Sequence, residues 1–224
     1  ELSGTQYTPE KGWDENKLDM FRRHIIQLGT TGVFVIYDEL EGKEAVTWSY
    51  LLHTVELPME IQELTDEVKV IGKNKAGGVS VAHLFSSAKT EQAMVDTFFC
   101  APTNWKNVTN AQGKTLKYPN HWHFSSTTVP CKTARFLTVM DTHGKNRPDM
   151  QVVRKGNTIQ VGDWTITCNL TEKGKAAIYV SNKTEKVSLN YDAGKKEGAT
   201  IVTDQVKGKQ VTKVLTDYLP DFEI

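Results

Sequence analysis

The apolar residues of this chain fall in short runs that glycine, asparagine and lysine interrupt. Residues 21–28 form a mostly apolar run, and residues 33–37, Val-Phe-Val-Ile-Tyr, are β-branched or aromatic at every position. The Gly-Thr-Thr-Gly sequence at 29–32 is typical of a tight turn. We therefore predict two strands joined by this turn. The second should be central in its sheet, because five consecutive apolar positions cannot all be hidden if one face meets water.

Comparable strand signals recur along the rest of the chain at intervals of roughly 8 to 15 residues. They lie at 47–54, 68–71, 78–85, 93–98, 121–129, 134–140, 150–154, 158–161, 164–169, 176–181, 200–204 and 208–215. Gly-Asn, Gly-Asp, Gly-Lys and Asn-Lys pairs between many of them suit the positive φ angles of hairpin turns. A helical period is missing, apart from a helical turn or two that residues 86–96 allow. The pattern predicts an all-β fold of stacked antiparallel β-sandwich type.

The spacing of the strands changes near residues 130–134. Before this point the strands are longer and the loops irregular, whereas after it the strands are short and the turns tight. We therefore expect a large β-sandwich unit over residues 1–130, followed by a small C-terminal sandwich over 131–224.

Composition narrows the classes of function. The chain has 224 residues, which can bury a substantial core, and its 27 Lys and Arg residues equal its 27 Asp and Glu residues. This balance disfavours a nucleic-acid partner. No run approaches the ~20 apolar residues that span a bilayer, so no membrane partner is expected. The chain opens without Met in a polar segment, which suggests a piece of a longer precursor whose targeting signal lies upstream.

Cysteine and histidine are the first candidates for metal or redox chemistry. Cys100, Cys131 and Cys168 are widely spaced, so at most one disulfide can form, and whether one does is left open. His121 and His123 should share one side of a strand, because side chains alternate with period 2. A zinc site needs a third donor, and the sequence has neither an HExxH motif nor a cysteine pair at metal spacing. We expect no metal and no cofactor; partly exposed sheet histidines or sugar contact are the alternatives.

Several other residues are candidates for binding an acidic sugar. Arg22 and Arg23 should lie on opposite faces of the first strand, where each can bind a carboxylate or sulfate bidentately or form an internal salt bridge. His24 and His53 can converge on Asp38 from neighbouring strands, or each can be satisfied separately. A further candidate is Trp105, which lies in a polar loop and can offer a stacking platform for a sugar ring. No nucleophile elbow, P-loop or GxGxxG motif is present, and no catalytic residue is assigned.

Three of these segments together resemble the heparinase II/III family of polysaccharide lyases. They are Phe-Arg-Arg-His-Ile-Ile-Gln-Leu at 21–28, Val-Phe-Val-Ile-Tyr-Asp-Glu-Leu at 33–40 and Trp-Ser-Tyr-Leu-Leu-His at 48–53. Residues 134–140 are similar to the strand that opens the final small β domain of that family. The resemblance extends over residues 15–220, and its sharpest matches lie in the first part of that range.

The resemblance implies an upstream helical (α/α) toroid and β-elimination on uronate-containing polysaccharides. Such a lyase neutralises the uronate carboxylate so that a His or Tyr base can remove the α-proton. The family's catalytic groups lie mainly on the toroid, with a His-x-His-x-Asp motif on an earlier sheet, and this sequence contains neither. We therefore carry over no catalytic residue and expect the chain to be inactive alone.

The expected function is the C-terminal β-sandwich part of a secreted or periplasmic bacterial lyase. Its expected partners are an acidic polysaccharide and the upstream toroid. Two alternatives remain open: a freestanding carbohydrate-binding or adhesion module, and a complete small hydrolase that uses His121 and His123.

Overall fold

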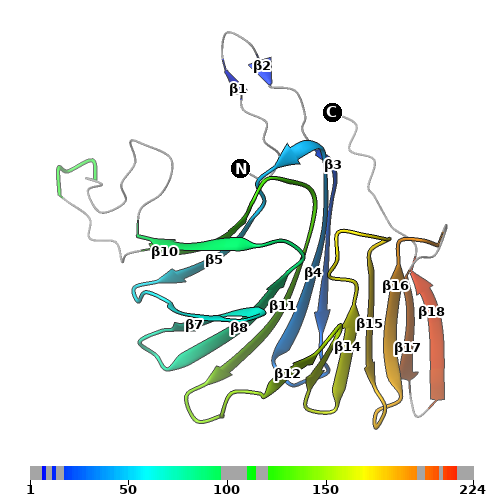
Figure 1. Cartoon of the computed structure of the whole chain (residues 1–224). Helices are drawn as coiled ribbons and strands as arrows, with labels where there is room; N and C mark the ends of the chain where they lie inside the picture. The colour runs from blue at the N-terminus through cyan, green and yellow to red at the C-terminus, as the bar shows by residue number, and fades with distance from the viewer. Residues whose placement is uncertain are drawn as a thin grey trace. The chain divides into compact units, whose positions relative to one another are not determined.

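A computed structural model describes residues 7–8, 12–13, 18–96, 110–114, 121–195, 200–206 and 209–215. These residues form antiparallel strands and turns without any helix, which confirms the predicted all-β class (Figure 1). No helix able to cross a membrane occurs in this described part of the chain. The chain divides into two compact units, Glu1–Asp149 and Met150–Ile224.

The first unit contains a six-stranded and a three-stranded antiparallel sheet. It also contains the two-stranded pair β1 (Tyr7–Thr8) and β2 (Gly12–Trp13). In spatial order the larger sheet consists of β3 (Leu18–Gln27), β4 (Val33–Val46), β11 (Cys131–Gly144), β8 (Gly78–Ser86), β7 (Glu67–Lys73) and β6 (Glu60–Leu64). The smaller sheet consists of β5 (Ser49–Val55), β10 (His121–Thr128) and β9 (Thr90–Val95).

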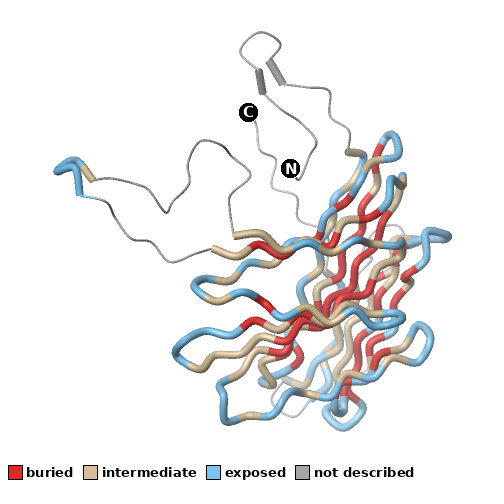
Figure 2. Tube along the Cα trace, turned by 60° about the vertical axis from the view of Figure 1, so that its left-hand side comes forward, coloured by how far each residue is buried: buried red, intermediate tan, exposed pale blue. Residues whose placement is uncertain are grey.

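The two sheets of the first unit pack face to face over one hydrophobic core. Leu40, Leu84 and Phe136 point into it from the larger sheet, and Tyr50 and Phe124 from the smaller one. Buried and more exposed residues alternate along many strands (Figure 2), as a two-layer sandwich requires. The expected sandwich is therefore present in this unit.

The hairpin β3–β4 forms as predicted, with its turn at 29–32. Gly32 has a φ of 79°, and a side chain there would bring Cβ within 2.7 Å of the Thr142 carbonyl oxygen. The Gly32 carbonyl in turn accepts hydrogen bonds from the Thr142 amide at 3.0 Å and hydroxyl at 2.8 Å. The close approach that glycine permits thus fastens this turn to β11. Strand β4 lies between β3 and β11, and Val33, Val35 and Tyr37 are fully buried.

The second unit is a seven-stranded sheet in which each strand pairs with the next along the chain. Its strands are β12 (Val152–Lys155), β13 (Thr158–Val161), β14 (Trp164–Cys168), β15 (Ala177–Asn182), β16 (Val187–Asp192), β17 (Thr200–Val206) and β18 (Lys209–Leu215). Ile159, Ile166 and Val180 lie on one face by register and are buried, whereas Tyr179 on the other face is 43% exposed.

The structure differs from the sequence-based expectations in three places. The units meet at Asp149–Met150 instead of at 130/131, because β11 returns to the first unit and pairs with both β4 and β8. Residues 90–95, where a helical turn was allowed, form an edge strand beside β10. Strands β6 and β16 were not foreseen; β6 is largely polar, and β16 has a period-2 pattern that was overlooked.

Candidate functional site

The two arginines of β3 are held in internal ion pairs. The guanidinium of Arg23 binds Asp38 through two contacts, Nε to Oδ1 at 2.6 Å and Nη2 to Oδ2 at 2.8 Å. This hydrogen-bonded carboxylate raises the pKa of Arg23. The Arg22 Nη1 atom lies 4.0 Å from Glu39 Oε2 on the other face of the strand. Of the two uses that the sequence left open for these arginines, the structure shows the internal one.

His24, Asp38 and His53 do not come together. Asp38 faces Arg23, whereas His24 lies on the opposite face of the hairpin and stacks on Tyr37, with ring centroids 6.2 Å apart. His53 belongs to β5, which lies in the other sheet. The convergence was left open because the three strands are consecutive, but the chain passes from one sheet to the other between β4 and β5.

His53, His121 and His123 instead form a histidine cluster on the smaller sheet. His123 pairs directly with His53 across strands β10 and β5, and their ring centroids are 4.4 Å apart. His121 lies two residues away on the same face, as predicted. His123 is only 5% exposed, and this burial lowers its pKa, which the neighbouring His53 and His121 lower further.

The structure also answers part of the cysteine and metal questions. Cys131 and Cys168 are free thiols, and burial raises the pKa of Cys168 to about 12, so this thiol stays protonated and unreactive. Cys100 and Trp105 lie outside the described residues. Among the described side chains, no group of three or more His, Cys, Asp or Glu residues is arranged to hold a metal ion.

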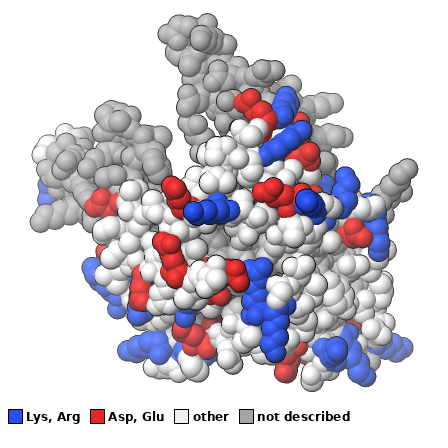
Figure 3. Space-filling model, in the orientation of Figure 1, with Lys and Arg blue, Asp and Glu red and all other residues white. Residues whose placement is uncertain are grey.

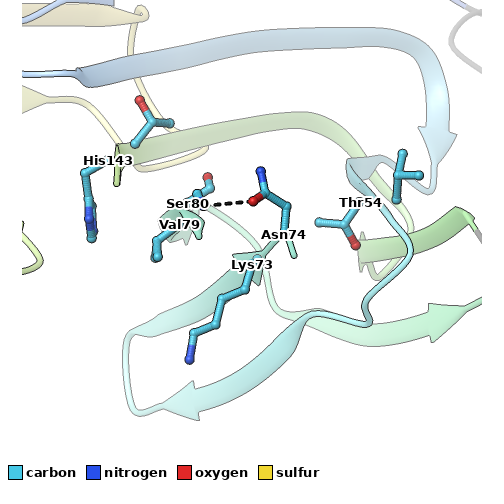
Figure 4. A pocket seen from close by; sticks show the side chains of 10 residues that line it. Thr54, Lys73, Asn74, Val79, Ser80 and His143 are labelled. Carbon is cyan, nitrogen blue, oxygen red and sulfur yellow. Dashed lines mark hydrogen bonds between the residues drawn. The ribbon is translucent and has the colours of Figure 1, made fainter. Parts of the chain in front are cut away.

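A hollow of about 550 Å³ opens at one end of the first unit (Figure 4). Gly72, Ser80 and Thr142 lie side by side across β7, β8 and β11, and Thr54 of β5 faces them from the other sheet. A side chain on Gly72 would approach Thr54 Cγ2 to 3.0 Å, so this glycine allows the two layers to come close. The hollow is also lined by Val55, Lys73, Asn74, Gly78, Val79 and His143.

Hydrogen bonds fix the polar groups at the rim of this hollow. The Thr54 hydroxyl donates to the Leu57 carbonyl at 2.8 Å, and Asn74 Oδ1 accepts from the Gly78 amide at 2.8 Å. Figure 4 shows Lys73 and His143 directed to the same side of the sheet, as their shared row with Val79 requires. Ser80 and Thr142 lie in the next row and face the opposite side, toward Thr54, so the hydroxyl groups and the basic side chains lie on the two faces of this sheet end.

A second hollow of about 520 Å³ adjoins the first and shares Gly78 with it. Its other lining residues are Ala76, Gly77, Gly144, Lys145, Asn146 and Arg147. Arg147 is bound to the Asp141 carboxylate, whereas Lys73 and Lys145 form no ion pair with any described residue. We call the two adjoining hollows the end site.

Among the residues that the structure describes, no Asp or Glu lines the end site. On the molecular face in Figure 3, basic and acidic side chains are interspersed, so a lining without carboxylates is a local feature. Carboxylates do lie nearby: Glu56 is bound to Lys75 at 3.2 Å, and Asp149 approaches His143 at 3.1 Å. Both are already engaged by basic groups, which leaves Lys73 and Lys145 available to an anionic ligand.

The end site was not found from the sequence. Lys73 and Asn74 lie at the β7–β8 turn and Lys145 lies in the turn after β11, where such residues usually serve the turn. The available signal was that a hairpin turn and the end of another strand both carry lysine, but only the register of β11 with β8 places Gly144 opposite Gly78 and brings these segments together.

Comparison of the chain with models of known protein families gave no match. Comparison with curated protein sequences gave none either.

Proposed function

We propose that this chain is the β-sandwich part of a polysaccharide lyase that cleaves uronate-containing glycans by β-elimination. In this proposal it supports a helical catalytic toroid and supplies one wall of the substrate cleft, in a secreted or periplasmic bacterial enzyme. The resemblance to the heparinase II/III family supports the proposal, and the three segments that carry it overlap the consecutive strands β3, β4 and β5.

The observation that carries the proposal is the pair of lysines in the end site, whose described lining residues include no carboxylate. A uronate glycan presents one carboxylate and several hydroxyls per acidic sugar. Lys73 and Lys145 can pair with the acidic groups, and the Asn74 amide can bond to sugar hydroxyls. Ordinary surface charges attract anions without regard to shape, but a hollow between the β7–β8 turn and the turn after β11 also limits the shape of its ligand.

Binding by the purified chain is the direct test. We expect oligosaccharides of heparin, heparan sulfate or alginate to bind more tightly than a neutral oligosaccharide of equal length, with an affinity that falls as salt is added. Replacing both Lys73 and Lys145 by Ala should weaken binding about tenfold, on the order of 1.4 kcal/mol. Lys43→Ala removes an exposed lysine from the far end of β4 and is the matched control. Equal affinity for acidic and neutral glycans would rule out the end site as an acidic-sugar site.

Catalysis gives the second test. A lyase must hold a carboxylate neutraliser and a base within hydrogen-bond reach of one sugar, and we assign neither role to a residue of this chain. We therefore expect no unsaturated uronate, which absorbs in the ultraviolet, to accumulate when the chain alone is mixed with these polymers. Steady growth of that absorbance, abolished by His24→Ala or His53→Ala, would show that the sandwich carries its own active centre. Low-micromolar glycan binding by the chain alone would favour a freestanding binding module.

A further inference from the structure

The histidine cluster has a geometry that the sequence did not reveal. The sequence predicts His121 and His123 on one face of a strand. It does not show which residue of another strand could act as a further metal ligand. Strand β5 provides it, because its register with β10 sets His53 directly opposite His123. The two rings meet edge to face, with an interplanar angle of 73° and a centroid distance of 4.4 Å.

Opposed residues on antiparallel strands have Cβ atoms about 4.5–5.5 Å apart. Two imidazoles at that spacing can turn one nitrogen each toward a common ion, since metal–nitrogen bonds are about 2.0–2.1 Å long. Antiparallel pairing fixes both backbones, so little freedom is lost on binding. The nearest residues on this face by register are His121, Ser125, Leu51, Val55 and Val95, and none of these five is a carboxylate.

An imidazole binds a metal only in its neutral form, so protons compete with a metal ion for the two rings.

We propose that His53 and His123 form a two-imidazole site for Cu²⁺, with water in the remaining coordination positions. Nitrogen donors favour Cu²⁺ over the other divalent ions of its row. The protein donors are these two rings, since no group of three or more suitable ligands occurs among the described residues. This site lies outside the residues that line the end site and does not rest on the proposed glycan function.

The test is to titrate the full chain with Cu²⁺ at pH 7.5 and to measure binding by calorimetry and by electron paramagnetic resonance. We expect one ion per chain and a spectrum with nitrogen hyperfine coupling. His53 is exposed, so His53→Ala should fold normally, as a thermal melt can verify, and should weaken binding at least about tenfold. His123→Ala should also weaken Cu²⁺ binding at least about tenfold. Lowering the pH to 5 should weaken Cu²⁺ binding by the natural chain.

His24→Ala is the control, because His24 lies on the other sheet, and it should leave Cu²⁺ affinity unchanged. Three results would each overturn the proposal: affinity that does not change in folded His53→Ala, a spectrum with oxygen ligands only, or no binding tighter than millimolar. Glycan binding is measured separately on the same variants, so failure of the metal site leaves the end site untouched.

Discussion

The two side chains of the Arg23–Asp38 ion pair differ widely in their exposure to solvent. The Asp38 side chain is 2% exposed and the Arg23 side chain is 40% exposed. The arginine also lies near the Tyr50 ring, with its guanidinium carbon 5.6 Å from the ring centroid, so it joins the β3–β4 hairpin to a residue of the other sheet. The pair therefore buries a carboxylate that depends on a cation still in contact with water.

Removing the cation should cost more than removing the carboxylate. Arg23→Ala leaves Asp38 buried without its counter-ion, and we expect a loss of about 3 kcal/mol in the free energy of unfolding. Asp38→Ala leaves a guanidinium that water can reach, and should cost about 1 kcal/mol. Urea denaturation of both variants and of the double variant measures the difference. Equal losses would show that the carboxylate is solvated in the folded chain.

His123 should make stability depend on pH. Its pKa in the folded chain lies below the ordinary value of 6.5. As the pH falls through 6.5, the unfolded chain therefore takes up the proton first, and the folded state loses stability until the lower, folded pKa is passed. The stability that the neutral ring contributes is thus present at pH 7 and above.

We expect His123→Asn to reduce the loss of stability between pH 7 and pH 5, measured by urea denaturation at both values. Ser125 lies on the same face of β10 as His123. Replacing Ser125 by Ala removes no titrating group, so the Ser125→Ala variant should keep the pH dependence of the natural chain. An undiminished loss in His123→Asn would assign the pH dependence to other groups.

At the scale of the elements, the turn of β3–β4 allows a matched comparison of two glycines. Gly32 and Gly156 both have positive φ, 79° and 61°, but only at Gly32 would an added Cβ meet a close neighbour, the Thr142 carbonyl oxygen at 2.7 Å. Gly156→Ala should cost about 1 kcal/mol through backbone conformation alone. Gly32→Ala adds a clash with backbone and should cost about 3 kcal/mol. Thermal or urea unfolding measures both, and equal costs would mean that β11 moves aside freely.

Elements that depend on neighbouring residues could be predicted from the sequence, whereas their assembly could not. The run at 33–37 and its Gly-Thr-Thr-Gly turn specify a hairpin within about 20 residues, and that hairpin is present. Strand β11 pairs with β4, almost one hundred residues earlier. The sequence of β11 does not indicate which strand it pairs with. The misplaced unit boundary has this cause.

The candidate sites show the same limit. Period-2 alternation correctly placed His121 and His123 on one face. It gave no indication that His53 lies opposite His123, or that Lys145 lies beside the β7–β8 turn, because both facts follow from pairing between distant strands. Charge compensation of Arg22 and Arg23 was one of two open interpretations, and only the register with Glu39 and Asp38 distinguished them.

For the whole molecule, the position of the unit boundary predicts which truncations fold. A chain that ends at Asp149 keeps β11 between β4 and β8, whereas a chain that ends at Pro130 loses the strand that joins them. We expect the first to show a cooperative unfolding transition and a β-type circular dichroism spectrum, and the second to show neither. A cooperative transition in the shorter chain would restore the boundary at 130/131.

The position of β11 also has a consequence for how the chain reaches its folded state. Until residues 131–144 have left the ribosome, β4 and β8 both have an unpaired edge, and apolar edges of this kind invite pairing with other chains. The larger sheet must therefore wait for a strand made late, through contacts that are remote in sequence and slow to form. The seven-stranded sheet is synthesised last, but it pairs only successive strands. Each of its strands can therefore pair with the preceding one as soon as it is made. Synthesis order and assembly order are thus decoupled in this protein, and the interval before β11 emerges is when it most needs protection from aggregation.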